Sequence, residues 1–257
     1  MTLGVGILGA AGRMGGALIR GLREQRIPGL RLAAAVDRPD VSDPSLDLVP
    51  AEVGIAASDV LIDFSFHAAA AFHADLCAEA GKPLVLGTTG LTEDDQRRVV
   101  AAARQVAVVQ APNMSLGVNL LMVLAEQAAR ALQDRGYDVE IVERHHRKKK
   151  DSPSGTALGL GEAVARGYGW DLRETAVHGR EGVAPGERPE REIGFHAVRG
   201  GDFVGDHTVI FAAEGECVEL GHRATTRDTF ATGALRAAAW VATKPAGLYS
   251  MRDVLGL

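Results

Sequence analysis

Apolar strand-like runs and helical segments alternate through the first 110 residues of the chain. Five short apolar runs have the composition of buried strands, at residues 3–8, 31–37, 59–66, 82–87 and 106–110. Helical segments lie between them, at residues 14–25, 67–80 and 92–105. Repeated βα units with apolar strands predict a parallel sheet that is covered by helices on both faces. We therefore expect an α/β fold in this half.

The pattern changes after Pro112. A long helix is predicted at residues 115–135, and an alternating strand follows at residues 137–143. A helix at residues 153–167 comes next, and then three strand-like runs, at residues 192–198, 203–213 and 217–224. A final helix is expected at residues 228–243. These runs predict a second, smaller α+β domain with a mostly antiparallel sheet.

Charge and cysteine content exclude several classes of protein. The formal net charge of −5 gives no reason to expect a nucleic acid or a membrane as a partner. No apolar run approaches the roughly 18 residues of a membrane-spanning helix. Cys77 and Cys217, the two cysteines, are too few for a disulfide framework, so we expect reduced thiols. Because a buried strand begins at residue 3 with no basic region before it, we expect no cleavable leader and a cytoplasmic location.

A glycine-rich turn joins the first strand to the first helix. Gly9, Gly12 and Gly15 stand in the run GAAGRMG. Glycine lets the backbone approach a pyrophosphate closely, and the helix N-terminus supplies free amides and positive potential. The context predicts a dinucleotide site, although the GxxGxxG spacing departs from GxGxxG. A tight turn without a ligand is the alternative.

An acidic and a basic residue follow the second strand. Asp37 lies 22 residues after Gly15, where an acidic side chain can accept hydrogen bonds from both ribose hydroxyls of NAD. Arg38 comes next, and its guanidinium can hold the 2′-phosphate of NADP instead. The pair predicts mixed cofactor use, with a solvated loop pair as the alternative.

Small residues end the fourth and fifth strands. Gly87-Thr88-Thr89-Gly90 follows the fourth, and Ala111-Pro112-Asn113-Met114 follows the fifth. Ligands of open α/β sheets bind at this carboxyl edge, so these segments are candidates to line the nicotinamide half. Ordinary turn chemistry explains each segment equally well when it is taken alone.

The most unusual stretch is basic. Residues 144–150 read RHHRKKK, and all seven can carry positive charge in a chain that is acidic overall. The run lies between a strand and a helix, which argues against a flexible polybasic tail. Lysine and histidine also give and take protons, so such a cluster can both bind an anion and catalyse. No carboxylate or thiolate stands at a suitable spacing, so we expect no metal site.

The helix after the basic run adds a second anion-binding feature. Ser152 and Pro153 are predicted as its N-cap and first residue. The amides and hydroxyls of Ser154, Gly155 and Thr156 would then face an incoming anion. The predicted ligand is a small dianion, most simply a dicarboxylate.

These motifs together resemble those of a known family, the bacterial dihydrodipicolinate reductases of the diaminopimelate–lysine pathway. The enzymes are also called 4-hydroxy-tetrahydrodipicolinate reductases. The matching residues are GAAGRMG at 9–15, GTTG at 87–90, APN at 111–113, ERHHRKK at 143–149 and PSGT at 153–156. The resemblance covers nearly the whole chain in order, and the HHxxK…PSGT block is its most specific part.

The resemblance implies a domain organisation and an assembly. An N-terminal Rossmann domain would span residues 1–114, and an inserted substrate-binding and oligomerisation domain would span residues 115–226. Residues 227–257 would return as a C-terminal helix to the dinucleotide-binding domain. The family also implies a homotetramer that is built largely through the sheets of the inserted domain.

Roles follow residue by residue from the resemblance. His145 is implied as proton donor and acceptor, and Lys149 as proton donor. The implied substrate contacts are His146, Ser154, Gly155 and Thr156. The implied cofactor contacts are Gly9, Ala10, Ala11, Gly12, Arg13, Met14, Asp37, Arg38, Gly87, Thr88, Thr89, Ala111, Pro112, Asn113 and Met114. Family members often carry Glu in place of Asp37 and Phe in place of Met114, which leaves the choice between NADH and NADPH open.

The implied reaction is the NAD(P)H-dependent reduction of 4-hydroxy-tetrahydrodipicolinate to tetrahydrodipicolinate. The nicotinamide would give a hydride, and His145 or Lys149 would supply the balancing proton. Three alternatives stay open at this point. They are a different NAD(P)-dependent dehydrogenase of a small anion, such as an amino-acid dehydrogenase, a nucleotide-sensing or scaffold protein that has no activity, and a nucleic-acid contact through residues 144–150.

Overall fold

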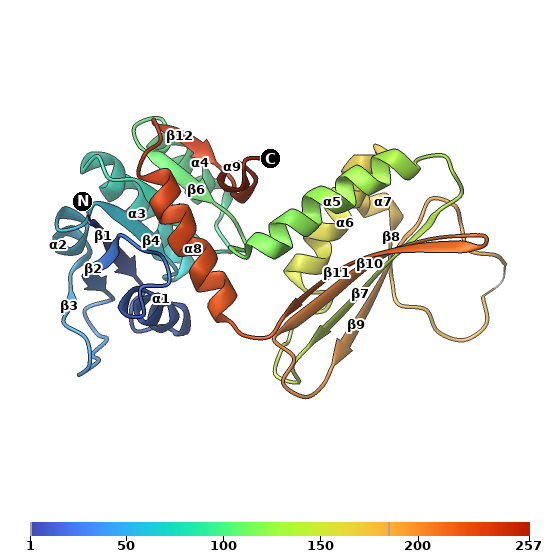
Figure 1. Ribbon diagram of the computed structural model, residues 1–257, viewed down its shortest axis with the longest axis horizontal. Coiled ribbons are helices and arrows are strands. Elements are labelled where there is room, and N and C mark those ends of the chain that lie inside the picture. Colours follow the sequence, from blue (N-terminus) through green and yellow to red (C-terminus); the bar gives the residue numbers. More distant parts are fainter. Residues whose placement is uncertain (1, 185) are drawn as a thin grey trace. The chain divides into compact units, whose positions relative to one another are not determined.

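The computed structural model describes residues 2–184 and 186–257, so Met1 and Pro185 lie outside the described residues. The chain forms two compact units. The first contains residues 2–116 and 228–257, and the second contains residues 117–227 (Figure 1).

The first unit is built on a sheet of seven strands that are all parallel. Its strand order is β12-β6-β5-β4-β1-β2-β3. The strands are β1 (Leu3–Leu8), β2 (Leu30–Val36), β3 (Leu48–Val49), β4 (Val60–Asp63), β5 (Leu84–Leu86), β6 (Ala107–Gln110) and β12 (Gly247–Tyr249). The chain runs outward from β1 to β3 and then crosses back to β4. This reversal makes the carboxyl ends of β1 and β4 the topological switch point, where open α/β sheets bind ligands.

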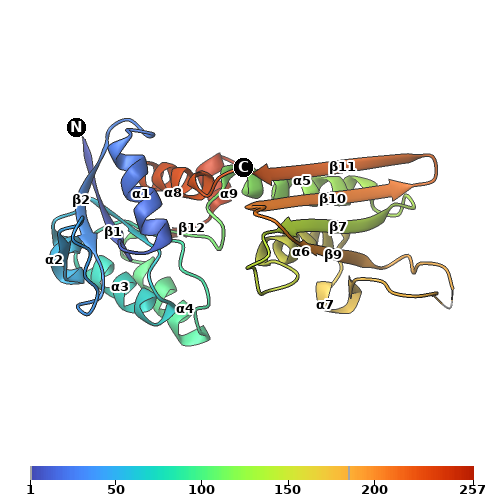
Figure 2. The ribbon, with the colours of Figure 1, turned by 90° about the horizontal axis from the view of Figure 1, so that it is seen from below.

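Helices cover both faces of this sheet. Helices α1 (Arg13–Arg23) and α8 (Asp228–Val241) lie on one face, and α2 (Ala51–Ala56), α3 (His67–Glu79) and α4 (Glu93–Ala102) lie on the other (Figure 2). A short helix, α9 (Met251–Leu255), ends the chain. The expected Rossmann-type parallel sheet is therefore confirmed.

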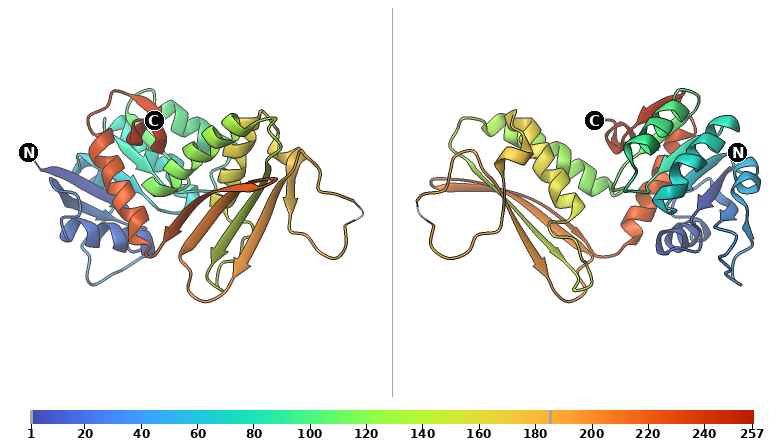
Figure 3. Two further views of the ribbon diagram at one scale, coloured as in Figure 1. Left: turned by 45° about the vertical axis from the view of Figure 1, so that its right-hand side comes forward. Right: turned by 180° about the vertical axis from the view of Figure 1, so that it is seen from behind.

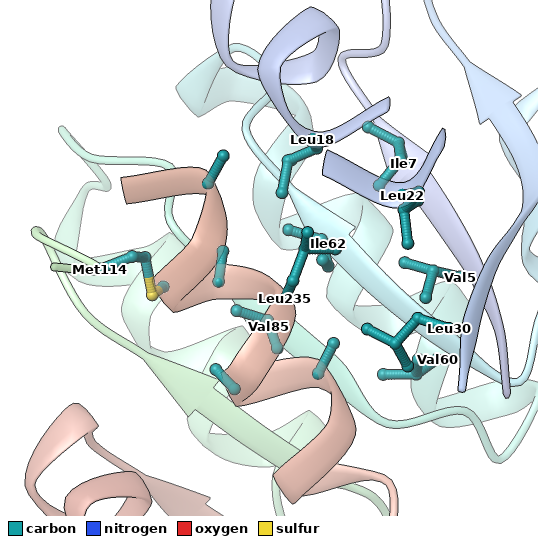
Figure 4. Close-up of a cluster of buried hydrophobic side chains, with 14 of the residues drawn as sticks. Val5, Ile7, Leu18, Leu22, Leu30, Val60, Ile62, Val85, Met114 and Leu235 are labelled. Carbon is teal, nitrogen blue, oxygen red and sulfur yellow. The ribbon is translucent and has the colours of Figure 1, made fainter. Parts of the chain in front are cut away.

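One hydrophobic cluster joins the C-terminal helix to the N-terminal strands. Leu235 of α8 packs with Leu18 and Leu22 of α1 over Val5 and Ile62 of the sheet (Figure 4). Full burial of one such leucine side chain contributes about 1.5–3 kcal/mol. Residues 228–257 therefore complete the core of the first unit, although they follow the second unit in the sequence.

The glycine turn allows α1 to approach β1 very closely. A Cβ atom on Gly15 would lie 2.3 Å from the Gly9 carbonyl oxygen and 2.4 Å from that of Ala10. Gly9 has a φ of +84°, which side-chain-bearing residues rarely adopt. Both glycines are therefore required by the backbone itself.

The second unit contains a five-stranded sheet in the order β11-β10-β7-β9-β8. The strands are β7 (Asp138–His145), β8 (Ala176–His178), β9 (Ile193–Arg199), β10 (Gly205–Ala213) and β11 (Glu216–Ala224). Helices α5 (Leu116–Leu132) and α6 (Gly155–Tyr168) pack on one face of the sheet (Figure 3), and α7 (Leu172–Thr175) is a single turn before β8.

The sheet of the second unit is mixed, whereas the sequence pattern favoured a mostly antiparallel one. β10 pairs antiparallel with β7 and β11, but β9 pairs parallel with β7 and β8. The connection from β7 to β9 passes through α6, and such a crossover returns the chain in its original direction. The α+β character of this unit is as expected.

The helix after the basic run begins two residues later than predicted. Ser154, and not Ser152, is the N-cap of α6, and its Oγ accepts a hydrogen bond from the Ala157 amide at 3.2 Å. The Ser154 amide itself donates to the Glu143 carboxylate at 2.9 Å, so Ser154 stands outside the helical ladder. The expectation for Ser152 and Pro153 was therefore wrong.

Among residues 2–184 and 186–257, no helix combines the length and the apolar character that crossing a membrane demands.

Candidate functional site

The glycine turn after β1 lies beside the end of β2. The Asp37 carboxylate accepts hydrogen bonds from the Ala11 and Arg38 amides, each at 2.9 Å. Gly12 precedes α1 and provides no side-chain cap. The first amides of a helix have no partner within the helix, so here they remain available to an anion.

A cavity of about 570 Å³ opens at this turn. It brings together five of the sequence-predicted residues: Gly9, Ala11, Gly12, Asp37 and Arg38. Phe66 and Phe72 from the β4–α3 segment add apolar surface. The Arg38 side chain is 67% exposed and lies 3.6 Å from Asp40, so it is accessible to a bound anion. An apolar cavity with an acidic and a basic group at its rim has the chemistry to hold an adenosine moiety.

A buried polar network supports the wall of this cavity. Asp63, at the end of β4, is fully buried and accepts hydrogen bonds from the Thr88 hydroxyl at 2.8 Å and the Ser65 amide at 2.8 Å. Nδ1 of His73 lies 2.7 Å from the second oxygen of Asp63. The carboxylate thus ties together the ends of β4 and β5 and the first turns of α3.

The residues after β5 and β6 line a second cavity of the same unit, of about 560 Å³. Its walls include Thr88, Thr89, Ala111 and Pro112 together with Tyr249 of β12. These residues and those of the glycine turn therefore line two separate cavities on the first unit.

Several predicted cofactor contacts are buried or have a side chain that is already hydrogen-bonded. Met114 is 1% exposed and packs in the cluster around α8, and Ala10 is fully buried. Gly87 is buried against the Phe64 ring. The Asn113 side chain accepts a hydrogen bond from the Ser115 amide at 2.9 Å. Arg13 is exposed and Met14 is half-buried at the start of α1.

In the second unit, His145 lies in a network of charged and polar groups. Its Nδ1 is 2.5 Å from the Glu143 carboxylate. Arg199, at the end of β9, donates to both oxygens of Glu143 at 2.6 and 2.7 Å. Burial alone would raise the pKa of Glu143, but the hydrogen bonds from His145, Arg199 and Ser154 outweigh it and lower the pKa to about 2. Glu143 is therefore a carboxylate acceptor at neutral pH.

A second imidazole packs against His145. The rings of His145 and His207 meet edge to face with centroids 5.1 Å apart. Nε2 of His207 lies 3.2 Å from the Ser154 hydroxyl. Burial lowers the pKa of His207 to about 4, and the neighbouring His145 adds to the effect. His207 is therefore neutral at physiological pH.

The rest of the basic run divides into paired and solvent-facing residues. Lys149 is 21% exposed, and its Nζ lies 2.8 Å from Asp151. Nε2 of His146 lies 3.1 Å from the Arg227 guanidinium, and burial followed by this cation lowers the pKa of His146. Arg147, Lys148 and Lys150 are exposed, as is Gly155 at the start of α6, and Thr156 is half-buried. Within one unit the chain thus gathers His145, His146, Lys149 and the N-terminus of α6.

Four participants were missed by sequence reasoning. Glu143 stands two residues before His145, and the two-residue period of a strand could have placed both side chains on one face. Arg199, His207 and Arg227 are distant in sequence. The strand register brings Arg199 and His207 to the cluster, and Arg227 reaches it from the segment between β11 and α8. In the part of the chain that the structure describes, no group of three or more His, Cys, Asp or Glu side chains is arranged to hold a metal ion.

Comparison with known families agrees with the resemblance that the sequence motifs show. Residues 3–114 match the family model described as "Dihydrodipicolinate reductase, N-terminus", and residues 117–255 match "Dihydrodipicolinate reductase, C-terminus". A 4-hydroxy-tetrahydrodipicolinate reductase from Halorhodospira halophila is 53% identical over the whole of both chains, and one from Thiobacillus denitrificans is also 53% identical over the whole of both.

A solved structure agrees at the level of the fold. A dipicolinate-bound dihydrodipicolinate reductase from Paenisporosarcina sp. TG-14 superposes with a TM-score of 0.79 and 24% identity. The match covers 98% of this chain and 99% of that one. Given both family models and relatives that share more than half of their residues with it, this chain belongs to the dihydrodipicolinate reductase family.

Proposed function

We propose that the protein reduces 4-hydroxy-tetrahydrodipicolinate to tetrahydrodipicolinate with NADH or NADPH, in diaminopimelate and lysine biosynthesis in the cytoplasm. The observation that carries the proposal is the cluster of His145, Lys149 and the α6 N-terminus in a chain whose relatives bear this enzyme name over their full length. A nucleotide sensor or scaffold would not need a proton-exchanging cluster of this kind.

The residues of the first unit fit a dinucleotide. The cavity beside the glycine turn is large enough for a nucleoside, and Gly9 and Gly12 line it without side chains. When bound, the reduced nicotinamide supplies the hydride. The first amides of α1, at Arg13 and Met14, would hold the pyrophosphate, and Asp37 would accept hydrogen bonds from the adenosine ribose. The remaining proposed contacts are Ala10, Arg13, Met14, Arg38, Gly87, Thr88, Thr89, Ala111, Pro112, Asn113 and Met114.

The residues of the second unit fit a small dicarboxylate. The amides of Gly155 and Thr156 begin α6, where the helix dipole favours an anion, and Ser154 caps the same turn. His146 and Lys149 would add donors to the substrate carboxylates. His145 or Lys149 would give the proton that balances the arriving hydride. Because Lys149 pairs with Asp151, a substrate carboxylate must compete with that ion pair.

The choice between NADH and NADPH turns on Asp37 and Arg38. Asp37 is suited to the two free hydroxyls of NADH, and the exposed Arg38 guanidinium is suited to the 2′-phosphate of NADPH. We propose that the enzyme uses both cofactors.

We propose further that the chain acts as a homotetramer through the sheet of the second unit. Helices α5 and α6 pack on the face that carries Ile141 and Phe211. Alternate residues such as Val142, Val198 and Ile210 lie on the opposite face of the same strands. Light scattering of the purified protein should give four times the chain mass, and a monomer would contradict this part of the proposal.

The direct test is an assay with freshly generated hydroxylated tetrahydrodipicolinate, in which absorbance follows the oxidation of NADH and NADPH in separate reactions. We expect oxidation of both cofactors that depends on the substrate. If the protein oxidises NADH only with small keto acids and ammonia as co-substrates, it is an amino-acid dehydrogenase instead. If no substrate supports oxidation, the proposal fails.

A further inference from the structure

The Glu143 carboxylate is a buried hub of the second unit. It is 1% exposed and lies on β7 on the same face as His145. One oxygen accepts from His145 Nδ1 at 2.5 Å and from Arg199 at 2.7 Å. The other accepts from Arg199 at 2.6 Å and from the Ser154 amide at 2.9 Å. One carboxylate thus joins β7, the end of β9 and the start of α6.

This arrangement fixes the tautomer of the neutral His145 ring, and a second proton that the ring takes up and gives to the substrate is then on Nε2. An ionised carboxylate can only accept hydrogen bonds, so Nδ1 must be the N–H donor. Nε2 is then the nitrogen that is free to exchange a proton, and it has no hydrogen-bond partner among the described residues. Gly205 leaves space beside it, because a Cβ atom there would lie 3.2 Å from Nε2.

The imidazole is held on several sides. His207 packs against the ring and is linked through the Ser154 hydroxyl to the same helix start that Glu143 holds. Arg199 also donates to the carbonyl oxygens of Val198 and Asp151, so its guanidinium group is held in place independently of Glu143. The charged or titratable groups that surround His145 are Glu143, Arg199, His146, Lys149 and His207.

We propose that Glu143 is a positioning residue that holds His145 with its proton on Nδ1 and its Nε2 free for the substrate, and that Arg199 keeps the carboxylate in that position. The inference rests on the proposed function, in which His145 exchanges the proton. Because Glu143 also fixes the Ser154 amide, one carboxylate aligns the proton-exchanging nitrogen with the amides of α6. Neither residue needs to touch the substrate.

A purely structural role would give a different result. A buried carboxylate paired with a guanidinium can serve stability alone, and its loss would then lower the free energy of unfolding and leave the tautomer of His145 unchanged. A positioning role requires a change at His145 itself. The test must therefore measure the tautomer of His145 as well as the reaction rate.

The experiment compares wild type, Glu143→Gln and Arg199→Lys, with Glu126→Gln as the matched control. Glu126 is also a buried glutamate of the second unit, and it pairs with Arg130 and Arg166 on α5 and α6. ¹⁵N NMR of histidine-labelled protein reports the tautomer, and His145→Asn identifies the His145 signal. Steady-state assays give kcat and both KM values.

We expect His145 in wild type, at a pH where its ring is neutral, to be the Nδ1–H tautomer. In Glu143→Gln the amide can donate to Nδ1, so the proton should move to Nε2 and kcat should fall by about 100-fold or more, with the KM for NADH unchanged. Arg199→Lys keeps a cation but loses the fork, so it should retain the tautomer and lose less activity. Glu126→Gln should match wild type in both readouts.

Two results would overturn the inference. One is an Nε2–H tautomer in wild type, which is measured without any activity and holds even if the variants do not fold. The other is a folded Glu143→Gln enzyme whose kcat stays within about threefold of wild type, since loss of the orienting partner of a proton-exchanging histidine lowers the rate by more than that. Failure of the proposed function is distinct, because the wild type would then show no reductase activity at all.

Discussion

Asp37 and Ala11 are 26 residues apart in the sequence, and the Asp37 carboxylate accepts a hydrogen bond from the Ala11 amide at 2.9 Å. This contact fixes the acidic side chain against the glycine turn and leaves Arg38 at the rim of the cavity. Asp37 and Arg38 therefore have different positions relative to a bound nucleotide, and their contributions to cofactor binding can be measured separately.

Arg38→Ala should weaken the binding of NADPH more than the binding of NADH. A charge-assisted hydrogen bond to phosphate contributes about 1.5–3 kcal/mol, so the KM for NADPH should rise by about tenfold or more. The KM for NADH should change much less, because NADH has no 2′-phosphate. Parallel assays with both cofactors measure the difference. An equal loss for both would show that Arg38 does not read the phosphate.

Lys149→Ala should abolish most turnover and leave NADH binding intact. Lys149 belongs to the second unit, and the proposed cofactor contacts belong to the first. General acid catalysis typically contributes about 10²–10⁴-fold, so a loss in that range is expected. Fluorescence titration with NADH supplies the binding control. Unchanged turnover would refute the role of Lys149 as a proton donor.

Asp63→Asn should destabilise the first unit. The fully buried Asp63 carboxylate accepts from Thr88 and Ser65 and faces His73, and an amide cannot satisfy all three. We expect the free energy of unfolding to fall by about 1–3 kcal/mol. Urea denaturation measures it.

The control for Asp63→Asn is Asp75→Asn, which removes a half-exposed ion pair with Arg98. Exposed pairs contribute about 0–1 kcal/mol, so this variant should remain close to wild type. If both variants lost the same free energy, burial of the Asp63 network would not explain its effect.

His207 should make stability depend on pH. The pKa of His207 is lowered to about 4 in the folded chain from an ordinary value of 6.5, so the unfolded chain binds more protons between these two values. The contribution of His207 to stability is therefore full above pH 6.5 and is lost as the pH falls toward 4. The stability difference between wild type and His207→Gln should shrink over that interval in urea titrations. A difference that does not change with pH would contradict the assignment.

The main elements of the fold could be predicted because the pattern of apolar and polar residues in each one reflects its burial. β1 is apolar throughout and is buried, and α1 begins directly after the glycine turn that the sequence predicted. The elements that were not predicted are short: β3, β8 and β12 have two or three residues each, α7 has four, α9 has five and α2 has six. Such segments are too brief to show a period, and neighbouring strands decide their structure.

The site was less predictable for a similar reason. The parallel register of β7 and β9 places Arg199 opposite His145, and a single sequence does not reveal that register. The predicted start of α6 was two residues too early because the Ser154 amide donates a hydrogen bond to Glu143, 11 residues before it in the sequence. Local capping preferences alone favoured Ser152. Tertiary contacts therefore determined both the polar network and the helix boundary.

The most direct test of the account is a structure of the protein with NADH and dipicolinate bound together. We predict that the two carboxylates of dipicolinate contact the amides of Gly155 and Thr156, with Nε2 of His145 and Nζ of Lys149 beside the ring. A complex in which the dicarboxylate binds elsewhere, and both side chains face open solvent, would contradict the account.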